Sequence, residues 1–240
     1  MCASSGSSNL FLTVLMPAYN EAGGLAASVE ALLRALDGYG VTYELLIVDD
    51  ASTDTTGSVA EELAALHPQA RVIHHAANEG IGGGFVSGVA AARGEWFILI
   101  PADLAMDLAE LTRYFAAAES ADVLVGIRSN RSDYSGWRRA VSFANIELIR
   151  LLFGMRERQF NYITMYRLAV LRAMTIEYWR SAFFHAETII KAKALGYRIA
   201  EVEVSYVPRG TGRATGARPA LILATARDML HYWLRLRTGR

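Results

Sequence analysis

The chain has 240 residues, of which 52% are hydrophobic and 20% charged, with equal numbers of acidic and basic side chains. This size and composition predict an ordered globular protein of one or at most two domains and exclude an intrinsically disordered chain. The zero net charge offers no overall field for recruiting nucleic acid, and the single cysteine, Cys2, excludes a disulfide framework or a cysteine metal cage.

Residues 1–9 are mostly small and polar, without a basic region followed by an apolar stretch. They therefore predict a disordered tail rather than a signal peptide. No uninterrupted apolar window of about eighteen residues follows, so we expect no membrane span and a cytoplasmic protein.

The first half of the chain alternates between strand and helix patterns. The expected strands are residues 11–16, 45–48, 71–74, 96–100 and 122–126, and the expected helices are residues 25–36, 56–66, 85–92 and 108–118. The alternation predicts an α/β fold with a Rossmann-like, doubly wound and mostly parallel sheet.

The second of these strands ends in two adjacent carboxylates, Asp49 and Asp50, followed by the cap and turn residues Ser52, Thr53 and Asp54. Ligands of open α/β sheets bind beyond the carboxyl ends of the strands, so this stretch predicts a binding site. The alternative is that both carboxylates serve only the loop and the cap of the following helix.

A glycine-rich turn from Gly80 to Gly84 leads into a helix of small residues. A dinucleotide fingerprint needs glycine at its sixth place, where Phe85 stands. We therefore expect the small residues to allow close backbone approach and tight helix packing instead.

The second half combines arginines and aromatic residues with helical patterns, an alternating strand at 200–207 and a basic glycine-threonine loop at 210–216. A last helix spans about residues 220–236 and separates a main domain, 10–218, from a C-terminal amphipathic segment, 219–240. Two interpretations of this helix stay open, because it can pack on the domain or lie on a membrane surface. Its expected apolar face comprises Ile222, Ala226, Met229, Leu230, Trp233 and Leu236.

The motifs, taken in order, resemble the family 2 nucleotide-sugar glycosyltransferases of GT-A fold, and among them the dolichol- or polyprenyl-phosphate mannose and glucose synthases. The resemblance covers residues 11 to about 235. It is carried by the following stretches: residues 16–21 (MPAYNE), 47–54 (IVDDASTD), 78–82 (NEGIG), 102–104 (ADL) and 126–128 (GIR), then Glu187 ahead of Lys191-Ala192 and Gly196-Tyr197, and the loop from Arg209.

The resemblance implies that a nucleotide-diphosphate sugar donor binds at the first two strand ends. Base and ribose contacts would come from Pro17, Ala18, Tyr19, Glu21 and Asp49, with Asp50 and Gly80 in the same site. A carboxylate that accepts hydrogen bonds from a base edge or a ribose diol suits this task. Asp50 has the alternative role of orienting the loop through backbone amides.

The resemblance also implies a Mg²⁺ or Mn²⁺ ion that bridges the diphosphate, with Asp103 as its ligand. The sequence departs from the family at the flanking places, because Pro101 replaces the usual first aspartate and Ala105 a common glutamine. This departure implies weak metal binding, or binding only when the nucleotide supplies oxygens.

Phosphate groups would be surrounded by Arg128, Arg131, Arg139, Arg209 and Arg213, with solvated basic surface as the alternative for each. A polyprenyl phosphate acceptor needs no general base, whereas a hydroxyl or amine acceptor does. Glu187 is then the expected base and His185 the second candidate.

The leading functional hypothesis is inverting transfer of a hexose from a GDP-mannose- or UDP-glucose-type donor to polyprenyl phosphate, with peripheral attachment at the inner face of the membrane. One alternative is a soluble or secondary-metabolite hydroxyl or amine acceptor, and a further one is a non-catalytic nucleotide-sugar-binding protein. No nucleic-acid partner is expected, and a homodimer is left open.

Overall fold

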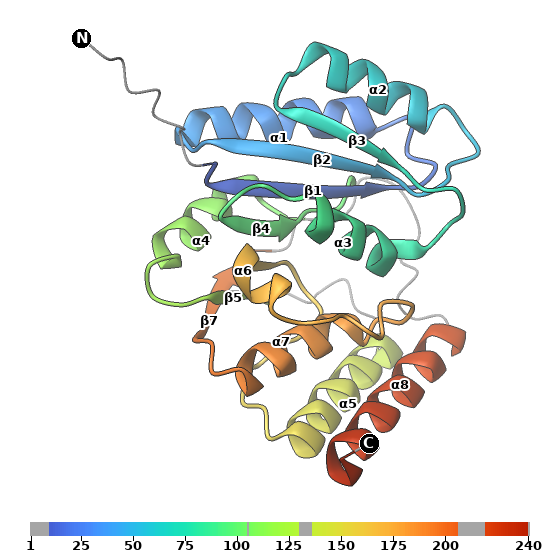
Figure 1. The fold of residues 1–240 in the computed structure, drawn as a ribbon, viewed down its shortest axis with the longest axis vertical. Helices are drawn as coiled ribbons and strands as arrows, with labels where there is room; N and C mark the ends of the chain where they lie inside the picture. The colour runs from blue at the N-terminus through green and yellow to red at the C-terminus, as the bar shows by residue number, and fades with distance from the viewer. Residues whose placement is uncertain (1–9, 105, 130–135, 206–218, 240) are drawn as a thin grey trace.

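A computed structural model describes residues 10–104, 106–129, 136–205 and 219–239. Its centre is a seven-stranded sheet of order β3-β2-β1-β4-β6-β5-β7 (Figure 1). All neighbouring strands are parallel except β6, which is antiparallel to both β4 and β5. The strands are β1 (Leu12–Ala18), β2 (Tyr43–Asp49), β3 (Ala70–His74), β4 (Trp96–Leu99), β5 (Val123–Arg128), β6 (Thr164–Arg167) and β7 (Ile199–Val204).

Helices connect these strands and cover both faces of the sheet. They are α1 (Leu25–Tyr39), α2 (Thr56–Leu66), α3 (Gly80–Ala91), the 3₁₀ turn η1 (Leu108–Glu110), α4 (Leu111–Ala117), α5 (Gly136–Phe153), α6 (Leu168–Arg172), α7 (Phe184–Ala194) and α8 (Pro219–Thr238). The expected alternation of the first half is confirmed, including the mostly parallel sheet. Neither β6 nor α6 was expected from the sequence, and β6 is too short for a clear period-2 pattern.

Two hydrophobic cores lie on opposite faces of the sheet because successive strand residues point to opposite sides. In β1, Val14 and Met16 belong to the core beneath α1, α2 and α4, whereas Leu15 belongs to the core beneath α3, α6 and α7. The apolar stripe expected on α1 is entirely buried in the first core: Leu25, Val29, Leu32, Leu33 and Leu36.

The small residues of α3 allow the close packing expected from the sequence. A Cβ on Gly88 would lie 2.7 Å from the side chain of Leu15 in β1. A Cβ on Gly82 would lie 1.9 Å from the carbonyl oxygen of Trp179, in the loop before α7. These glycines let α3 approach the sheet on one side and that loop on the other.

The last helix, α8, lies beside α5 (Figure 1). Met229 and Tyr232 join the second core, whereas Leu230 and Leu236 are 49% and 57% exposed. Tyr232 thus takes a buried place beside Met229, and these two leucines of the expected apolar face point to solvent. Among the described residues, no helix combines the length and apolarity needed to cross a bilayer.

Candidate active site

Strained loops follow three neighbouring strands at their carboxyl ends. In the described part of the chain, the non-glycine residues with positive φ are Asn20, Ala51 and Leu104. They follow β1, β2 and β4, which are adjacent in the sheet. Such backbone strain concentrates at functional sites, and parallel sheets bind ligands at this edge. The two observations place the candidate site here.

The first two loops are held together by Asn20. Its side-chain oxygen accepts hydrogen bonds from the backbone amides of Thr53 and Asp54. The backbone N–H of Asn20 donates to the Ser52 hydroxyl at 3.0 Å. Asp54 in turn accepts a 2.9 Å hydrogen bond from the amide of Thr56 at the start of α2. Of the three cap and turn residues, Asp54 is thus the one that contacts the helix start, although Thr55 holds the N-cap position and its side chain makes no cap hydrogen bond.

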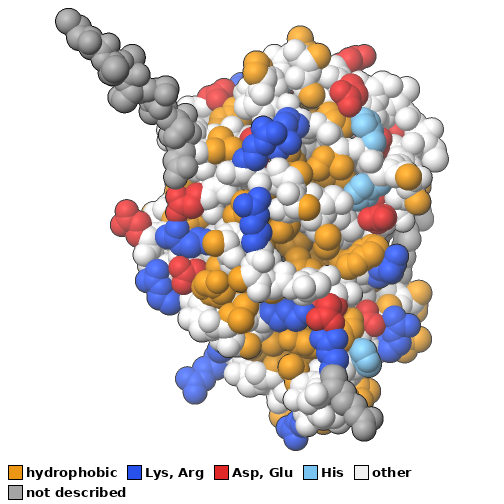
Figure 2. Space-filling view, in the orientation of Figure 1, with side chains coloured by type: hydrophobic (Ala, Val, Ile, Leu, Met, Phe, Trp, Pro, Cys, Tyr) orange, Lys and Arg blue, Asp and Glu red, His pale blue; other side chains and the backbone are white. Residues whose placement is uncertain are grey.

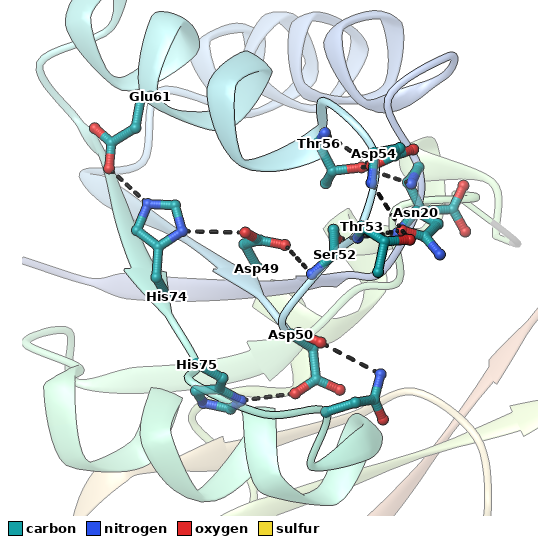
Figure 3. Close-up of polar contacts among 12 residues, drawn as sticks. Asn20, Asp49, Asp50, Ser52, Thr53, Asp54, Thr56, Glu61, His74 and His75 are labelled. Carbon is teal, nitrogen blue, oxygen red and sulfur yellow. Dashed lines mark hydrogen bonds and ion pairs between the residues drawn. The ribbon is translucent and has the colours of Figure 1, made fainter.

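Asp49 ends β2 and is only 7% exposed. One oxygen accepts a 3.1 Å hydrogen bond from the amide of Ser52, and the other lies 3.1 Å from Nδ1 of His74 (Figure 3). Although burial opposes it, the hydrogen bonds from Ser52 and His74 hold the pKa of Asp49 below its ordinary value. The carboxylate is therefore ionised at neutral pH, with two of its lone-pair directions used.

Asp50 follows β2, and its side chain points to the side opposite that of Asp49 (Figure 3). Its oxygens accept hydrogen bonds from the backbone amides of Glu79 and Gly80 at 2.8 and 2.7 Å and from Nδ1 of His75 at 2.7 Å. These contacts with backbone amides are the ones that the alternative role, orientation of the loop, requires. Gly80, with φ of +73°, is the first residue of α3.

The other residues expected around the base and ribose lie at the end of β1, the strand that pairs with β2. Pro17 and Ala18 close β1, and Tyr19 follows with 46% exposure. Glu21 is exposed, and its amide donates a 2.8 Å hydrogen bond to the Thr56 hydroxyl. The first loop thus presents side chains to solvent while its backbone is tied to α2.

Asp103 lies in the turn after β4. The amide of Leu104 donates to the carbonyl of Pro101 at 3.0 Å, and the positive φ of Leu104 tightens the turn. Within the described ranges, no three carboxylate, histidine or cysteine side chains form a cluster for a metal ion. Mg²⁺ and Mn²⁺ are commonly held by one or two carboxylates plus substrate phosphates, so Asp103 fits an ion that the nucleotide helps to bind.

A cavity of about 160 Å³ lies between the ends of β4 and β5. Pro101 and the 6%-exposed Arg128 line it, together with Arg138 from α5 and His185 from α7. The two guanidinium groups bring positive charge to the end of the strand that precedes Asp103. This is the chemistry that phosphate groups require.

A larger cavity of about 380 Å³ adjoins the first, because Arg138 and His185 line both. It lies between α5 and α8 and is predominantly apolar. Its apolar lining includes Val141, Ile146, Leu148, Leu221, Ile222 and Met229. A cavity lined by two arginines and a predominantly apolar cavity therefore lie next to each other.

The predicted arginines fall into three groups. Arg128 lines the smaller cavity, whereas Arg139 is exposed on α5 and lines neither cavity. Arg131, Arg209 and Arg213 lie outside the described residues, as does Ala105. Sequence reasoning did not select Arg138. Its sequence signal is helical spacing, since Arg138 lies on the same helix face as Val141 and Asn145, which line the same cavity.

Glu187 is fully buried on α7. Its oxygens accept hydrogen bonds from the backbone amides of Glu177 and Tyr178 at 2.8 and 2.9 Å, and from Nζ of Lys191 at 2.7 Å. These contacts are those of a residue that holds the 177–178 loop. His185 is closer to the cavities, and burial lowers its pKa to about 4, so its ring is neutral at pH 7.

Solved structures share this architecture. Glucosyl-3-phosphoglycerate synthase from Mycobacterium tuberculosis, solved with Mn²⁺, uridine diphosphate and phosphoglyceric acid, aligns with a TM-score of 0.68 at 19% identity. The alignment covers 95% of this chain and 78% of that one. Together with the sheet order, this similarity defines an α/β protein of GT-A fold.

The sequence comparison identifies the family. Residues 13–181 match the model for glycosyl transferase family 2, and the chain belongs to that family. It is 30% identical over 208 residues to the undecaprenyl-phosphate 4-deoxy-4-formamido-L-arabinose transferase of Edwardsiella ictaluri, covering 85% of this chain but only 62% of that protein. It is 28% identical to the undecaprenyl-phosphate mannosyltransferase of Micrococcus luteus, covering 83% and 85% of the two chains.

Proposed function

We propose that this protein transfers a hexose from a nucleotide-diphosphate sugar to polyprenyl phosphate, with inversion at the anomeric carbon. The observation that carries the proposal is that the two cavities are neighbours, with Arg138 and His185 lining both. A cationic cavity at the strand ends suits a phosphate, and the adjoining apolar cavity between α5 and α8 suits the first isoprene units. The names of the two relatives both combine undecaprenyl phosphate with the transfer of a sugar, which agrees with this acceptor.

The donor would lie across the ends of β1, β2 and β4. Asp49 would accept hydrogen bonds from the base, and the 19–21 loop would contact base and ribose. Asp103 would hold Mg²⁺ or Mn²⁺ together with the diphosphate oxygens, and the ion would neutralise charge on the leaving nucleotide.

The reaction needs few protein groups. An acceptor phosphate oxygen attacks the anomeric carbon, the bond from that carbon to the diphosphate breaks, and the nucleoside diphosphate leaves with the electron pair. Because the acceptor is already an anion, no base must remove a proton. Arg128 and Arg138 would position the phosphate and offset its charge. Glu187, which is buried and hydrogen-bonded to two backbone amides and Lys191, is compatible with a mechanism that has no base.

A lipid acceptor implies contact with a membrane surface. Exposed apolar side chains on α5 and α8 include Trp137, Phe143, Leu151, Leu223 and Leu234. Figure 2 shows hydrophobic side chains at the surface of the lower part of the molecule, with lysine and arginine side chains among them. Apolar side chains with a basic rim are typical of helices that lie on anionic bilayers, and we propose peripheral attachment through these two helices.

The test is a transfer assay with GDP-mannose and UDP-glucose in parallel, each with a short polyprenyl phosphate, with Mn²⁺ or with chelator. We expect metal-dependent sugar-lipid from one donor and none from the variant Asp103→Ala. Ala226→Phe fills the apolar cavity and should raise KM for the lipid but not for the donor, whereas Ala220→Phe, exposed on the same helix and outside the cavity, serves as its matched control.

Other outcomes separate the alternatives. Equal kinetics for Ala226→Phe and Ala220→Phe would contradict the lipid cavity. Donor binding with no sugar-lipid product would replace the lipid by a soluble hydroxyl or amine acceptor. If neither donor binds, the interpretation as a non-catalytic relative is favoured.

A further inference from the structure

Two consecutive histidines at the end of β3 face two consecutive aspartates at the end of β2. The strands pair in parallel with Asp49 opposite His74, and the amide of His75 donates to the carbonyl of Asp49 at 3.0 Å. Side chains alternate along a strand, so Asp49 and His74 point to the face covered by α2, and Asp50 and His75 to the other face. Figure 3 shows the two pairs on opposite sides of the strands.

His74 lies between two carboxylates. Nδ1 is 3.1 Å from an oxygen of Asp49, and Nε2 is 2.8 Å from an oxygen of Glu61 on α2. An ionised carboxylate only accepts hydrogen bonds, so both contacts require an N–H, and both exist together only in the imidazolium form. Among the described residues, Asp49 and Glu61 are the charged groups that face His74. The hydrogen bond to Glu61 and then that to Asp49 raise the pKa of His74 above its ordinary value.

The contact between Asp49 and His74 is closely packed. A Cβ on Gly57, in the first turn of α2, would lie 2.7 Å from an Asp49 oxygen and 3.4 Å from Cε1 of His74. The amide of Ser52 holds the other oxygen of Asp49. Hydrogen bonds with His74 and Ser52 and the close packing against Gly57 therefore fix the carboxylate. Its remaining lone pairs point in a defined direction.

We propose that protonated His74 is a positioning residue that holds the Asp49 carboxylate in the orientation that receives the donor's base. The proposal rests on the proposed role of Asp49 in donor binding. Glu61 acts indirectly, because its hydrogen bond with His74 keeps the proton on the imidazole ring. Neither residue needs to touch the nucleotide.

The sign of the pH effect follows from the hydrogen bonds. His74 carries both N–H groups below its pKa. As the pH rises through that pKa, one proton leaves, so one of the two contacts is lost together with the positive charge beside Asp49. Donor affinity is thus greatest below the pKa of His74 and falls above it. Loss of one charge-assisted hydrogen bond corresponds to a fall of roughly tenfold.

The experiment measures binding of UDP and GDP, each with Mn²⁺, by calorimetry from about pH 6 to about pH 9, a range that spans ordinary and raised histidine pKa values. In His74→Asn the side-chain amide takes the place of Nδ1, so it can donate to Asp49 but does not titrate. We expect this variant to keep most of the affinity without the wild-type fall. Glu61→Gln should move the fall to lower pH, and His74→Ala should bind roughly tenfold more weakly below the wild-type transition.

His67→Asn is the matched control, because Nε2 of His67 makes a similar 2.8 Å contact with Glu30 away from the strand ends. It should keep the wild-type pH profile, and thermal unfolding of each variant verifies that it is folded. An unchanged fall in His74→Asn would overturn the proposal, since the titration would then belong to the nucleotide phosphates or another group. If wild type binds neither nucleotide at any pH, the proposed donor site itself is rejected and this role of His74 with it.

Discussion

The carboxylate of Asp50 accepts a 2.7 Å hydrogen bond from the backbone amide of Gly80, which lies 30 residues further along the chain. The contact joins the end of β2 to the first residue of α3. Asp50 therefore sets where the glycine-rich helix begins, while its neighbour Asp49 faces the other side of the strand. One dipeptide thus has two tasks, loop orientation and proposed base recognition.

The variant Asp50→Asn should loosen this loop. The NH₂ group of asparagine would face either a backbone N–H or the ring of His75, and an NH₂ group cannot accept a hydrogen bond. At least one of the present hydrogen bonds is therefore lost. We expect a destabilisation of about 1–3 kcal/mol and a raised KM for the donor. Urea unfolding and donor kinetics measure both effects. Asp37→Asn, which alters an exposed contact with Tyr43, should change neither by a comparable amount.

Glu187 provides a test between a structural and a catalytic role. Since its oxygens hold two backbone amides and Lys191, Glu187→Gln should cost about 1–3 kcal/mol of stability. The kcat of the folded variant should stay within about threefold of wild type, whereas loss of a general base costs roughly 10²- to 10⁴-fold. Steady-state rates at saturating donor and acceptor, well below the unfolding temperature, measure kcat. A stable but inactive variant would support the base expected from the sequence.

Adjacent arginines on α5 should differ in their effect on the acceptor. Arg138 lines both cavities, and Arg139 is exposed and lines neither. Arg138→Ala should lower kcat/KM for polyprenyl phosphate by roughly tenfold or more, the loss expected for a charged hydrogen bond. Arg139→Ala should have a clearly smaller effect. The reverse order in a lipid-acceptor assay would mean that the phosphate binds on the outer face of α5.

The attachment of α8 should weaken in acid. Glu177, before α7, pairs with Arg235 of α8 and with Lys191, and these partners lower its pKa to about 2 from an ordinary 4.5. A lowered carboxyl pKa stabilises the fold above the ordinary value, and the contribution is lost as the pH falls toward 2. Because the pair is one-third exposed, we expect less than about 1 kcal/mol.

Thermal unfolding from about pH 7 to about pH 3, where carboxyl groups titrate, checks this expectation. Wild type should lose more stability than Glu177→Gln over this range, because the variant has no carboxyl group to protonate. Parallel curves for the two proteins would contradict the prediction. Arg34→Ala, which removes an exposed 3.8 Å pair with Glu30, should follow the wild-type curve.

Features that depend on near neighbours could be predicted from the sequence. The apolar stripe of α1, the buried strand that ends at Asp49 and the alternation of strand and helix are local patterns, because each helix or strand repeats its buried face within a few residues. They were sufficient to predict a mostly parallel sheet with a site at its carboxyl edge. The close packing of α3 also follows from composition alone, since only glycine allows such approach.

Which side chains contact one another depends on how the helices and strands pack. The antiparallel β6, the pairing of His74 with Asp49, the burial of Glu187 and the choice of Arg138 over Arg139 depend on strand register and helix rotation. Those are set by packing between residues far apart in the chain, as when Gly57 of α2 closes against Asp49 of β2. No local period encodes such contacts, because their free energy arises only once both elements are in place.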